Sequence, residues 1–152
     1  MVPKRSRIVE GRRAVTRTRV RFGETDSAGI VFYPMYFMWF DLGTHALLRE
    51  GDAPARGPDG APQHPLPIVE CGAKFFAPLK FDDPIEIVST VAELGESSLR
   101  VEHEVRHAGK TVARGFEARV YIRAEGGRIA KAPIPDDLRA RLTAGNVETA
   151  VG

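Results

Sequence analysis

The chain has 152 residues with a formal net charge of +2; 43% of the residues are hydrophobic and 28% are charged. A chain of this length ordinarily forms one domain and buries roughly two thirds of its unfolded surface. No apolar run approaches the roughly 20 residues of a membrane helix, so we expect no membrane partner.

The N-terminal segment concentrates positive charge. Eight of the 22 Lys and Arg residues lie between positions 4 and 21, where Glu10 is the only acid. This stretch lacks the interleaved aromatic residues of a single-strand nucleic-acid platform and the apolar segment of a secretory signal. We therefore expect residues 1–14 to form a solvated basic arm of a cytoplasmic protein without a nucleic-acid partner. The alternative is that some of these charges contact an anionic ligand such as a nucleotide phosphate.

One strand and one long helix are predicted in the first third of the chain. Residues 15–22 are β-branched and alternating, which predicts a strand with Val20 and Phe22 facing inward. Pro34 is the residue favoured in a first helical turn, and no other proline follows until residue 54. Apolar residues recur along this helix at spacings of four, three and four, which predicts that one face is buried. The residues of this face are Tyr36, Phe40, Gly43 and Leu47, and the glycine permits close packing.

The remainder predicts a loop followed by antiparallel strands. Residues 51–65 contain three glycines and four prolines and predict a long loop. Segments with period two follow at 66–76, 85–94, 99–108 and 111–124. In the third segment, the residues expected to face inward are Leu99, Val101, His103 and Val105. In the fourth segment, they are Val112, Phe116, Ala118, Val120 and Ile122. A terminal helix should begin at Pro135 and Asp136, and residues 146–152 are expected to be a flexible tail.

These elements predict an α+β domain in which one long helix is wrapped by a curved antiparallel sheet of about five strands. Such a sheet has two open edges and one uncovered face. Pairing of copies covers them, so we expect at least a homodimer.

Several kinds of catalytic site are excluded by the missing motifs. The chain has no nucleophile turn of the GxSxG type, no glycine-rich phosphate loop, no HExxH and no CxxC. His103 and His107 lie about 13 Å apart along a strand, too far to share a metal ion. Cys71 is expected to be a small core residue and, as the only cysteine, forms no internal disulfide. We expect neither a metal nor a cofactor.

Two carboxylates precede the predicted helix, Glu24 and Asp26. Backbone N–H groups at a helix N-terminus are unpaired and carry partial positive charge, so an acid near them is often only a cap. Asp26 precedes Pro34 by eight residues, which is too far for an ordinary cap. At this point a functional carboxylate and a structural one are both open.

The segment FGETDSAGIVFYPMYFMWFD resembles the signature of the 4-hydroxybenzoyl-CoA thioesterase family of hotdog-fold proteins. That signature reads F-G-D-x-D-x-x-G-I-V-[FWY]-[YH]-x-x-Y and continues into an apolar helix. The segment LPIVECGAKFFAPLKFDDPIEI is similar to the family's second block, a strand, a P-x-x-x-x-D turn and a further strand. The resemblance covers roughly residues 15 to 123 and places a hotdog domain at residues 15–145.

The resemblance implies a catalytic site at the start of the helix. It implies that Asp26 acts as nucleophile or general base and that the backbone N–H of Tyr33 polarises the thioester carbonyl. It further implies active sites at the interface of a homodimer, with dimers commonly paired into a homotetramer. Gly29 and Phe32 are expected to contact the substrate, and Asp41 to lie near a polar ring substituent of the acyl group.

The resemblance has one departure, in the residues expected to hold coenzyme A. Members with a hydroxylated benzoyl substrate carry a basic cluster before the fourth strand, where this chain reads GESSLR. We therefore expect other cations to contact the phosphates, first Arg100, with Lys80 and Arg123 as alternatives.

The expected function is hydrolysis of an acyl-CoA thioester, with the aromatic run at 32–40 favouring a benzoyl-like acyl group. The alternatives within the fold are short aliphatic acyl-CoA and acyl-carrier-protein substrates. A further alternative is a protein that binds acyl-CoA without catalysis.

Overall fold

The computed structural model describes residues 11–49 and 64–151. The predicted loop at 51–65 and the first residues of the basic arm lie almost entirely outside these ranges. The elements in chain order are β1 (Arg13–Arg19), the 3₁₀ turn η1 (Phe22–Glu24), α1 (Pro34–Leu48), β2 (Ile68–Phe75), β3 (Pro84–Leu94), β4 (Ser98–His107), β5 (Lys110–Val120), β6 (Ile122–Glu125), β7 (Arg128–Lys131), α2 (Asp136–Leu142) and β8 (Asn146–Ala150).

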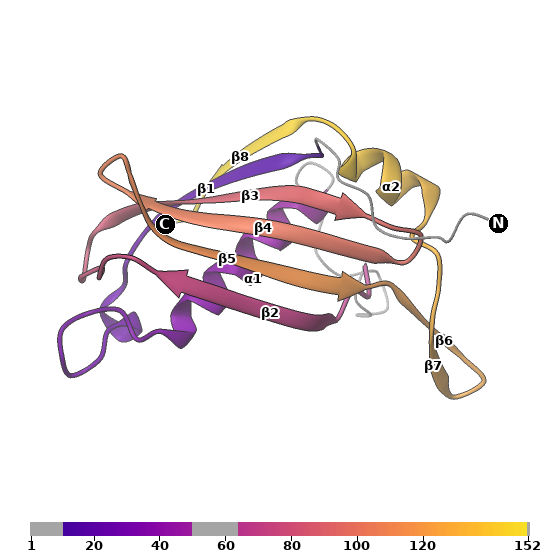
Figure 1. The fold of residues 1–152 in the computed structure, drawn as a ribbon, viewed down its shortest axis with the longest axis horizontal. Coiled ribbons are helices and arrows are strands. Elements are labelled where there is room, and N and C mark those ends of the chain that lie inside the picture. Colours follow the sequence, from indigo (N-terminus) through magenta and orange to yellow (C-terminus); the bar gives the residue numbers. More distant parts are fainter. Residues whose placement is uncertain (1–10, 50–63, 152) are drawn as a thin grey trace.

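A six-stranded sheet of order β2-β5-β4-β3-β1-β8 carries α1 across one face (Figure 1). The pairs are antiparallel except β1–β8, which is parallel. A separate hairpin, β6–β7, extends from one end of the sheet. The predicted α+β class, long helix and strands are confirmed, and the sheet has one strand more than expected.

The additional strand corrects the predicted flexible tail. Residues 146–150 pair with residues 13–17 of β1, and Val147 and Thr149 are half-buried between exposed neighbours. Without β8, the outer N–H and C=O groups of β1 would form an open sheet edge, which favours pairing with any strand that can reach it.

The core lies between α1 and the sheet and confirms the predicted helix face. Tyr36, Phe40, Gly43 and Leu47 are all buried. The first half of α1 packs against side chains that include Ile85, Ile87, Val105 and Val112, and the second half against Val101, Leu138 and Leu142. The terminal helix α2 therefore completes the core instead of standing apart from it.

The predicted inward face of β5 is wrong beyond Val112. Phe116, Ala118 and Val120 are only half-buried, whereas Glu117 and Arg119 are buried. The reversal follows from pairing, since Val101 faces inward on β4 and its partner on β5 is Glu117. Glu117 and Arg119 thus occupy the buried side of β5, where hydrophobic alternation predicts apolar residues.

Two further predictions of burial are wrong. Phe22 is 75% exposed, because the strand ends at Arg19 and the chain enters a 3₁₀ turn that breaks the alternation. Cys71 is exposed, because β2 is an edge strand whose one neighbour among the described strands is β5. None of the helices in the two described ranges is long and apolar enough to span a membrane.

Candidate active site

A compact loop connects η1 to the start of α1. Thr25 and Val31 form an isolated antiparallel bridge, and Asp26 N–H donates to the Ile30 carbonyl at 2.9 Å. Gly29 closes the tip by donating its N–H to the Asp26 carbonyl at 2.9 Å, with a φ of 81° that favours glycine. The loop therefore holds Asp26 in a tight turn directly before the helix.

The Asp26 carboxylate is exposed and only partly engaged. Its Oδ1 accepts the backbone N–H of Ala28 at 2.8 Å, which fixes the side-chain orientation. The side chain accepts no other hydrogen bond from the residues that the structure describes. One oxygen is thus oriented by the loop and the other is open to solvent, as a nucleophile or a general base requires.

Glu24 has a different environment and a structural role. Its Oε1 accepts the Arg21 N–H at 2.7 Å and its Oε2 accepts the indole N–H of Trp39 at 3.0 Å. One carboxylate oxygen therefore holds the chain at Arg21, and the other fastens the loop to α1.

The N-terminus of α1 presents one free donor. Tyr33 already has helical dihedral angles, φ −55° and ψ −32°, and Pro34 contributes no N–H. The N–H groups of Phe32 and Met35 donate to Glu24 and Phe32 carbonyls at 2.8 and 2.9 Å, whereas that of Tyr33 donates to no acceptor in the described part of the chain. This N–H, at the positive end of the helix dipole, has the geometry of an oxyanion donor.

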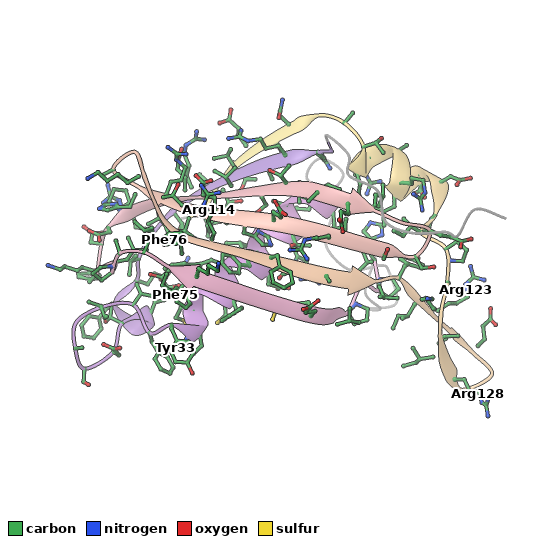
Figure 2. The ribbon with its side chains drawn as sticks, in the orientation of Figure 1. Tyr33, Phe75, Phe76, Arg114, Arg123 and Arg128 are labelled. Carbon is green, nitrogen blue, oxygen red and sulfur yellow. The ribbon has the colours of Figure 1, made fainter. Side chains whose placement is uncertain are left out.

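An aromatic cleft of about 360 Å³ opens beside this donor. Figure 2 shows Tyr33, Phe75 and Phe76 at the same end of the molecule. The ring of Phe75 packs edge-on against Tyr36 at 4.8 Å between centroids, and burial raises the pKa of the Tyr36 phenol. The cleft is lined by Ile30, Val31, Tyr33, Tyr36, Phe75, Phe76, Ala77 and Pro78.

Phe75 and Phe76 are site residues that the sequence reasoning missed. The sequence did contain a signal for them, namely two consecutive aromatic residues at the end of a predicted strand. Alternation along a strand would bury only one of the two. They are 45% and 57% exposed, so neither belongs to the core.

The structure does not bring all of the predicted site residues into this cleft. Asp26, Gly29 and Phe32 belong to the adjoining loop, with the Phe32 ring packed edge-on against Tyr33 at 5.5 Å. Arg100 lies on the face of the sheet away from α1, with its guanidinium 4.1 Å from the centre of the Phe116 ring. It lines a separate groove of about 480 Å³ together with Lys74 and Arg114.

Asp41 lies further along α1, and its carboxylate is half-exposed. Its Oδ1 accepts a hydrogen bond from Arg119 Nη2 at 2.7 Å. Its Oδ2 is 3.4 Å from His45 Nδ1, whose nearer partner is the Asp41 carbonyl at 2.8 Å. The sequence reasoning missed Arg119, for which two charged residues in an apolar strand were the available signal.

A buried polar cluster lies behind Arg119. The Ser89 hydroxyl is 2.7 Å from His103 Nδ1, and His103 Nε2 is 3.3 Å from Glu117 Oε1. The Thr44 hydroxyl donates to the same oxygen of Glu117. Serine, histidine and an acid also form hydrolase triads, but Ser89 is completely buried beneath Gly43, so it cannot reach a substrate.

The charge of Glu117 is stabilised by its partners. Burial opposes ionisation of this carboxyl, but hydrogen bonds from His103, Arg119 and Thr44 and the charge of Arg119 outweigh it and lower the pKa to about 2. No group of three His, Cys, Asp or Glu side chains that could hold a metal ion occurs within residues 11–49 and 64–151.

A helix N-terminus with a free donor, next to an aromatic cleft and a partly engaged acid, fits the class of hotdog thioester hydrolases. A profile of the Thioesterase-like superfamily matches residues 20–142. This chain belongs to that superfamily, as its signature predicted.

The relatives are named for CoA thioesters. A 1,4-dihydroxy-2-naphthoyl-CoA hydrolase from Synechococcus sp. (strain RCC307) is 34% identical over 129 residues, covering 82% of this chain and 97% of the relative. A 4-hydroxybenzoyl-CoA thioesterase from Pseudomonas sp. (strain CBS-3) is 29% identical over 138 residues, covering 82% and 94%. The solved structure of a gentisyl-coenzyme A thioesterase has a TM-score of 0.73 and 37% identity, covering 86% of this chain and 99% of that one. The hotdog fold and the assignment to thioester hydrolases are confirmed.

Proposed function

We propose that this protein hydrolyses the thioester of an aromatic acyl-CoA, with Asp26 as the catalytic carboxylate and the Tyr33 N–H as the oxyanion donor. The observation that carries the proposal is the unpaired Tyr33 N–H at the head of α1, beside a cleft lined by aromatic rings. The three relatives described above support it, since each is named for an aromatic acyl group that bears hydroxyl substituents.

The chemistry follows from the two groups. A carbonyl oxygen that accepts the Tyr33 N–H becomes more negative as the tetrahedral intermediate forms, and the helix dipole stabilises that charge. Asp26 either attacks the carbonyl carbon, expelling the CoA thiolate and leaving an anhydride for water to hydrolyse, or removes a proton from an attacking water. A thiolate is a good leaving group, so neither route needs a histidine acid.

The spacing along α1 supports a benzoyl-sized acyl group. Tyr33 and Asp41 are eight residues apart on one side of the helix, an axial rise of about 12 Å. A hydrogen bond of about 3 Å at each end leaves about 6 Å for the acyl group. One benzene ring with a para hydroxyl fills that span, with its carbonyl at Tyr33 and its hydroxyl at Asp41.

A homodimer paired through β2 would complete the site. The cleft is at the Phe75 end of this edge strand, and Arg123 lies on the β6–β7 hairpin at the opposite end of the sheet (Figure 2). A two-fold axis makes paired edge strands antiparallel, which brings Arg123 of the partner subunit toward the Tyr33 cleft. Arg123 then replaces Arg100 as the favoured contact for the CoA phosphates, because Arg100 is on the other face of the sheet.

Replacement of Asp26 tests the proposal. We expect Asp26→Asn to lower turnover of benzoyl-CoA and 4-hydroxybenzoyl-CoA on the order of a hundredfold, the scale of a lost acid–base group, while substrate binding is retained. Release of free thiol measures turnover, and isothermal titration measures binding. Glu24→Gln is the matched control, since it keeps an acceptor oxygen for Trp39, and it should leave turnover within a few fold.

Equal turnover in wild type and Asp26→Asn would contradict the role of Asp26. Binding of acyl-CoA without hydrolysis by the wild type would instead support a non-catalytic binding protein. Hydrolysis confined to aliphatic acyl-CoA would retain the mechanism and reject the aromatic substrate.

A further inference from the structure

Arg119 connects the buried polar cluster to the surface of α1. It is 6% exposed, although its partner Asp41 is half-exposed. Its Nη2 donates both to Asp41 Oδ1 at 2.7 Å and to Glu117 Oε2 at 3.1 Å, and its Nε donates to Glu117 Oε1 at 3.2 Å. Its Nη1 donates to the Leu66 carbonyl at 2.9 Å. All three guanidinium nitrogens are therefore engaged, and the planar group has little freedom to rotate.

The cluster behind Arg119 keeps Glu117 fixed as well. Thr44 donates to Glu117 from α1, and His103, at 3.3 Å, contacts it from β4. His103 is itself held between the Ser89 hydroxyl and the ring of Phe40, which stacks at 4.8 Å and 8°. Contacts from α1, β3, β4 and β5 thus fix the guanidinium that reaches Asp41.

Such a cluster is poorly explained by stability alone. A buried ion pair often contributes no more to stability than apolar residues of the same size would, because both charges lose their hydration. Here an apolar replacement would remove the hydrogen bond from Arg119 to Asp41, which among the described residues is the contact that joins the core to the Asp41 carboxylate. The charged pair of Arg119 and Glu117 therefore fixes the position of Asp41, which an apolar pair would not do.

The Asp41 carboxylate keeps one oxygen for a ligand. Arg119 occupies Oδ1, while Oδ2 is 3.4 Å from His45 Nδ1, a contact weaker than the one His45 makes with the Asp41 carbonyl. The side chain is 49% exposed, so this oxygen is open to a hydrogen-bond donor. A carboxylate oxygen accepts a phenolic O–H strongly, because the acceptor is charged.

We propose that Arg119, held by Glu117, is a positioning residue that sets the acyl-group specificity by fixing Asp41 where it accepts the hydroxyl of a hydroxylated aromatic acyl group. This inference rests on the proposed function. It adds that the preference for a hydroxylated over an unsubstituted ring depends on a residue that does not contact the substrate.

A double-mutant cycle on substrate preference tests the inference. The readout is the ratio of kcat/KM for 4-hydroxybenzoyl-CoA to that for benzoyl-CoA, with kcat and KM resolved for each. We expect Asp41→Asn and Arg119→Gln each to lower this ratio about tenfold or more, the scale of a hydrogen bond to a charged group. The double variant should lose no more than Asp41→Asn alone, because Arg119 acts through Asp41.

Two further variants separate positioning from general damage. Arg114→Gln removes an exposed arginine from the same strand, and its ratio should equal that of the wild type. Arg119→Lys keeps a charge beside Glu117 but lacks the fork that holds three partners, so it should fold and still lower the ratio. It serves as the test if Arg119→Gln does not fold, as judged by circular dichroism.

The outcomes distinguish this inference from the proposed function. A wild type that hydrolyses neither substrate contradicts both. A wild type that hydrolyses both equally well retains the thioesterase and overturns the inference. The inference is also overturned if Asp41→Asn lowers the ratio while folded Arg119 variants do not, or if the two losses are additive in the double variant.

Discussion

At the scale of single residues, Glu117 shows how the surroundings set the chemistry of a side chain. It is 1% exposed and ionised, with its pKa lowered to about 2 by hydrogen bonds and the charge of Arg119 despite the opposing effect of burial. A carboxyl whose pKa is lower in the folded than in the unfolded chain contributes stability above its unfolded value of 4.5. That contribution is lost as the pH falls from about 4.5 toward 2.

The pH dependence of stability tests this account. Glu117→Gln should be less stable than the wild type at pH 7 by about 3 kcal/mol, the free energy that corresponds to the lowered pKa. The difference should shrink between pH 5 and pH 3, as the wild type loses the contribution of the ionised carboxyl. Urea denaturation at pH 7, 5 and 3 measures it.

The control for this experiment is Glu125→Gln, which changes an exposed carboxylate. It should change the free energy of unfolding little at any of these pH values. A difference between wild type and Glu117→Gln that stays constant from pH 7 to pH 3 would mean that the charge of Glu117 is not what stabilises the fold.

At the scale of elements, the contact of α1 with the sheet depends on Gly43. A Cβ at this position would overlap the Ser89 hydroxyl and lie 3.3 Å from His103 Nδ1. The glycine therefore allows α1 to approach β3 and β4 closely enough for Thr44 to reach Glu117. Helix position and polar cluster are thus coupled, and both determine where Asp41 stands.

Replacement of Gly43 should reveal this coupling. Gly43→Ala adds a better helix former, which alone would stabilise by about 1 kcal/mol. The overlap with Ser89 should instead give a net loss of about 1–3 kcal/mol in the free energy of unfolding, the range for overpacking. Chemical denaturation measures the change.

Two variants control for other causes. Gly23→Ala adds a methyl group where no heavy atom lies within 4 Å, and it should not produce this loss. Gly43→Ala combined with Ser89→Ala should be less destabilised than the sum of the single variants, because the overlapping hydroxyl is removed. Strict additivity would show that the contact does not limit the packing of α1.

At the scale of the whole molecule, β2 is the longer of the two edge strands of the sheet. Within residues 11–49 and 64–151, β2 pairs with β5 alone, and its exposed apolar residues include Ile68, Val69 and Phe75. At the other edge of the sheet, β8 is a short strand of alternating exposure. A second copy on β2 would satisfy its backbone groups, cover these side chains and wall the Tyr33 cleft.

A charge on this edge should weaken the proposed homodimer. Val69 is 64% exposed, and Val69→Lys should raise the dissociation constant of the dimer at least tenfold, because pairing would bury a lysine. Analytical ultracentrifugation over a range of concentrations measures it. Val88→Lys, on the interior strand β3, which pairs with β1 and β4, is the control and should leave the dimer intact. Equal dissociation constants for the two variants would place the interface elsewhere.

The sequence by itself determined the long helix, the main strands and their order along the chain. Pro34 and the spacing of Tyr36, Phe40, Gly43 and Leu47 specified α1 and its buried face, because helix starts and amphipathic faces depend on residues close together in the chain. The signature around Asp26 and Tyr33 also indicated the family, which the superfamily match confirmed.

Only the tertiary structure decided which face of β5 lies inside. Local alternation favoured Phe116 in the core, but pairing with β4 places Glu117 and Arg119 there. Glu117 is held by His103 and Thr44, and Arg119 donates to Glu117 and Asp41. The tertiary structure also pairs the residues after 145 with β1 as strand β8, and it exposes Cys71 on an edge strand. Partners for buried charges and for strand edges come from segments distant in sequence, so no local pattern of residue types could reveal them.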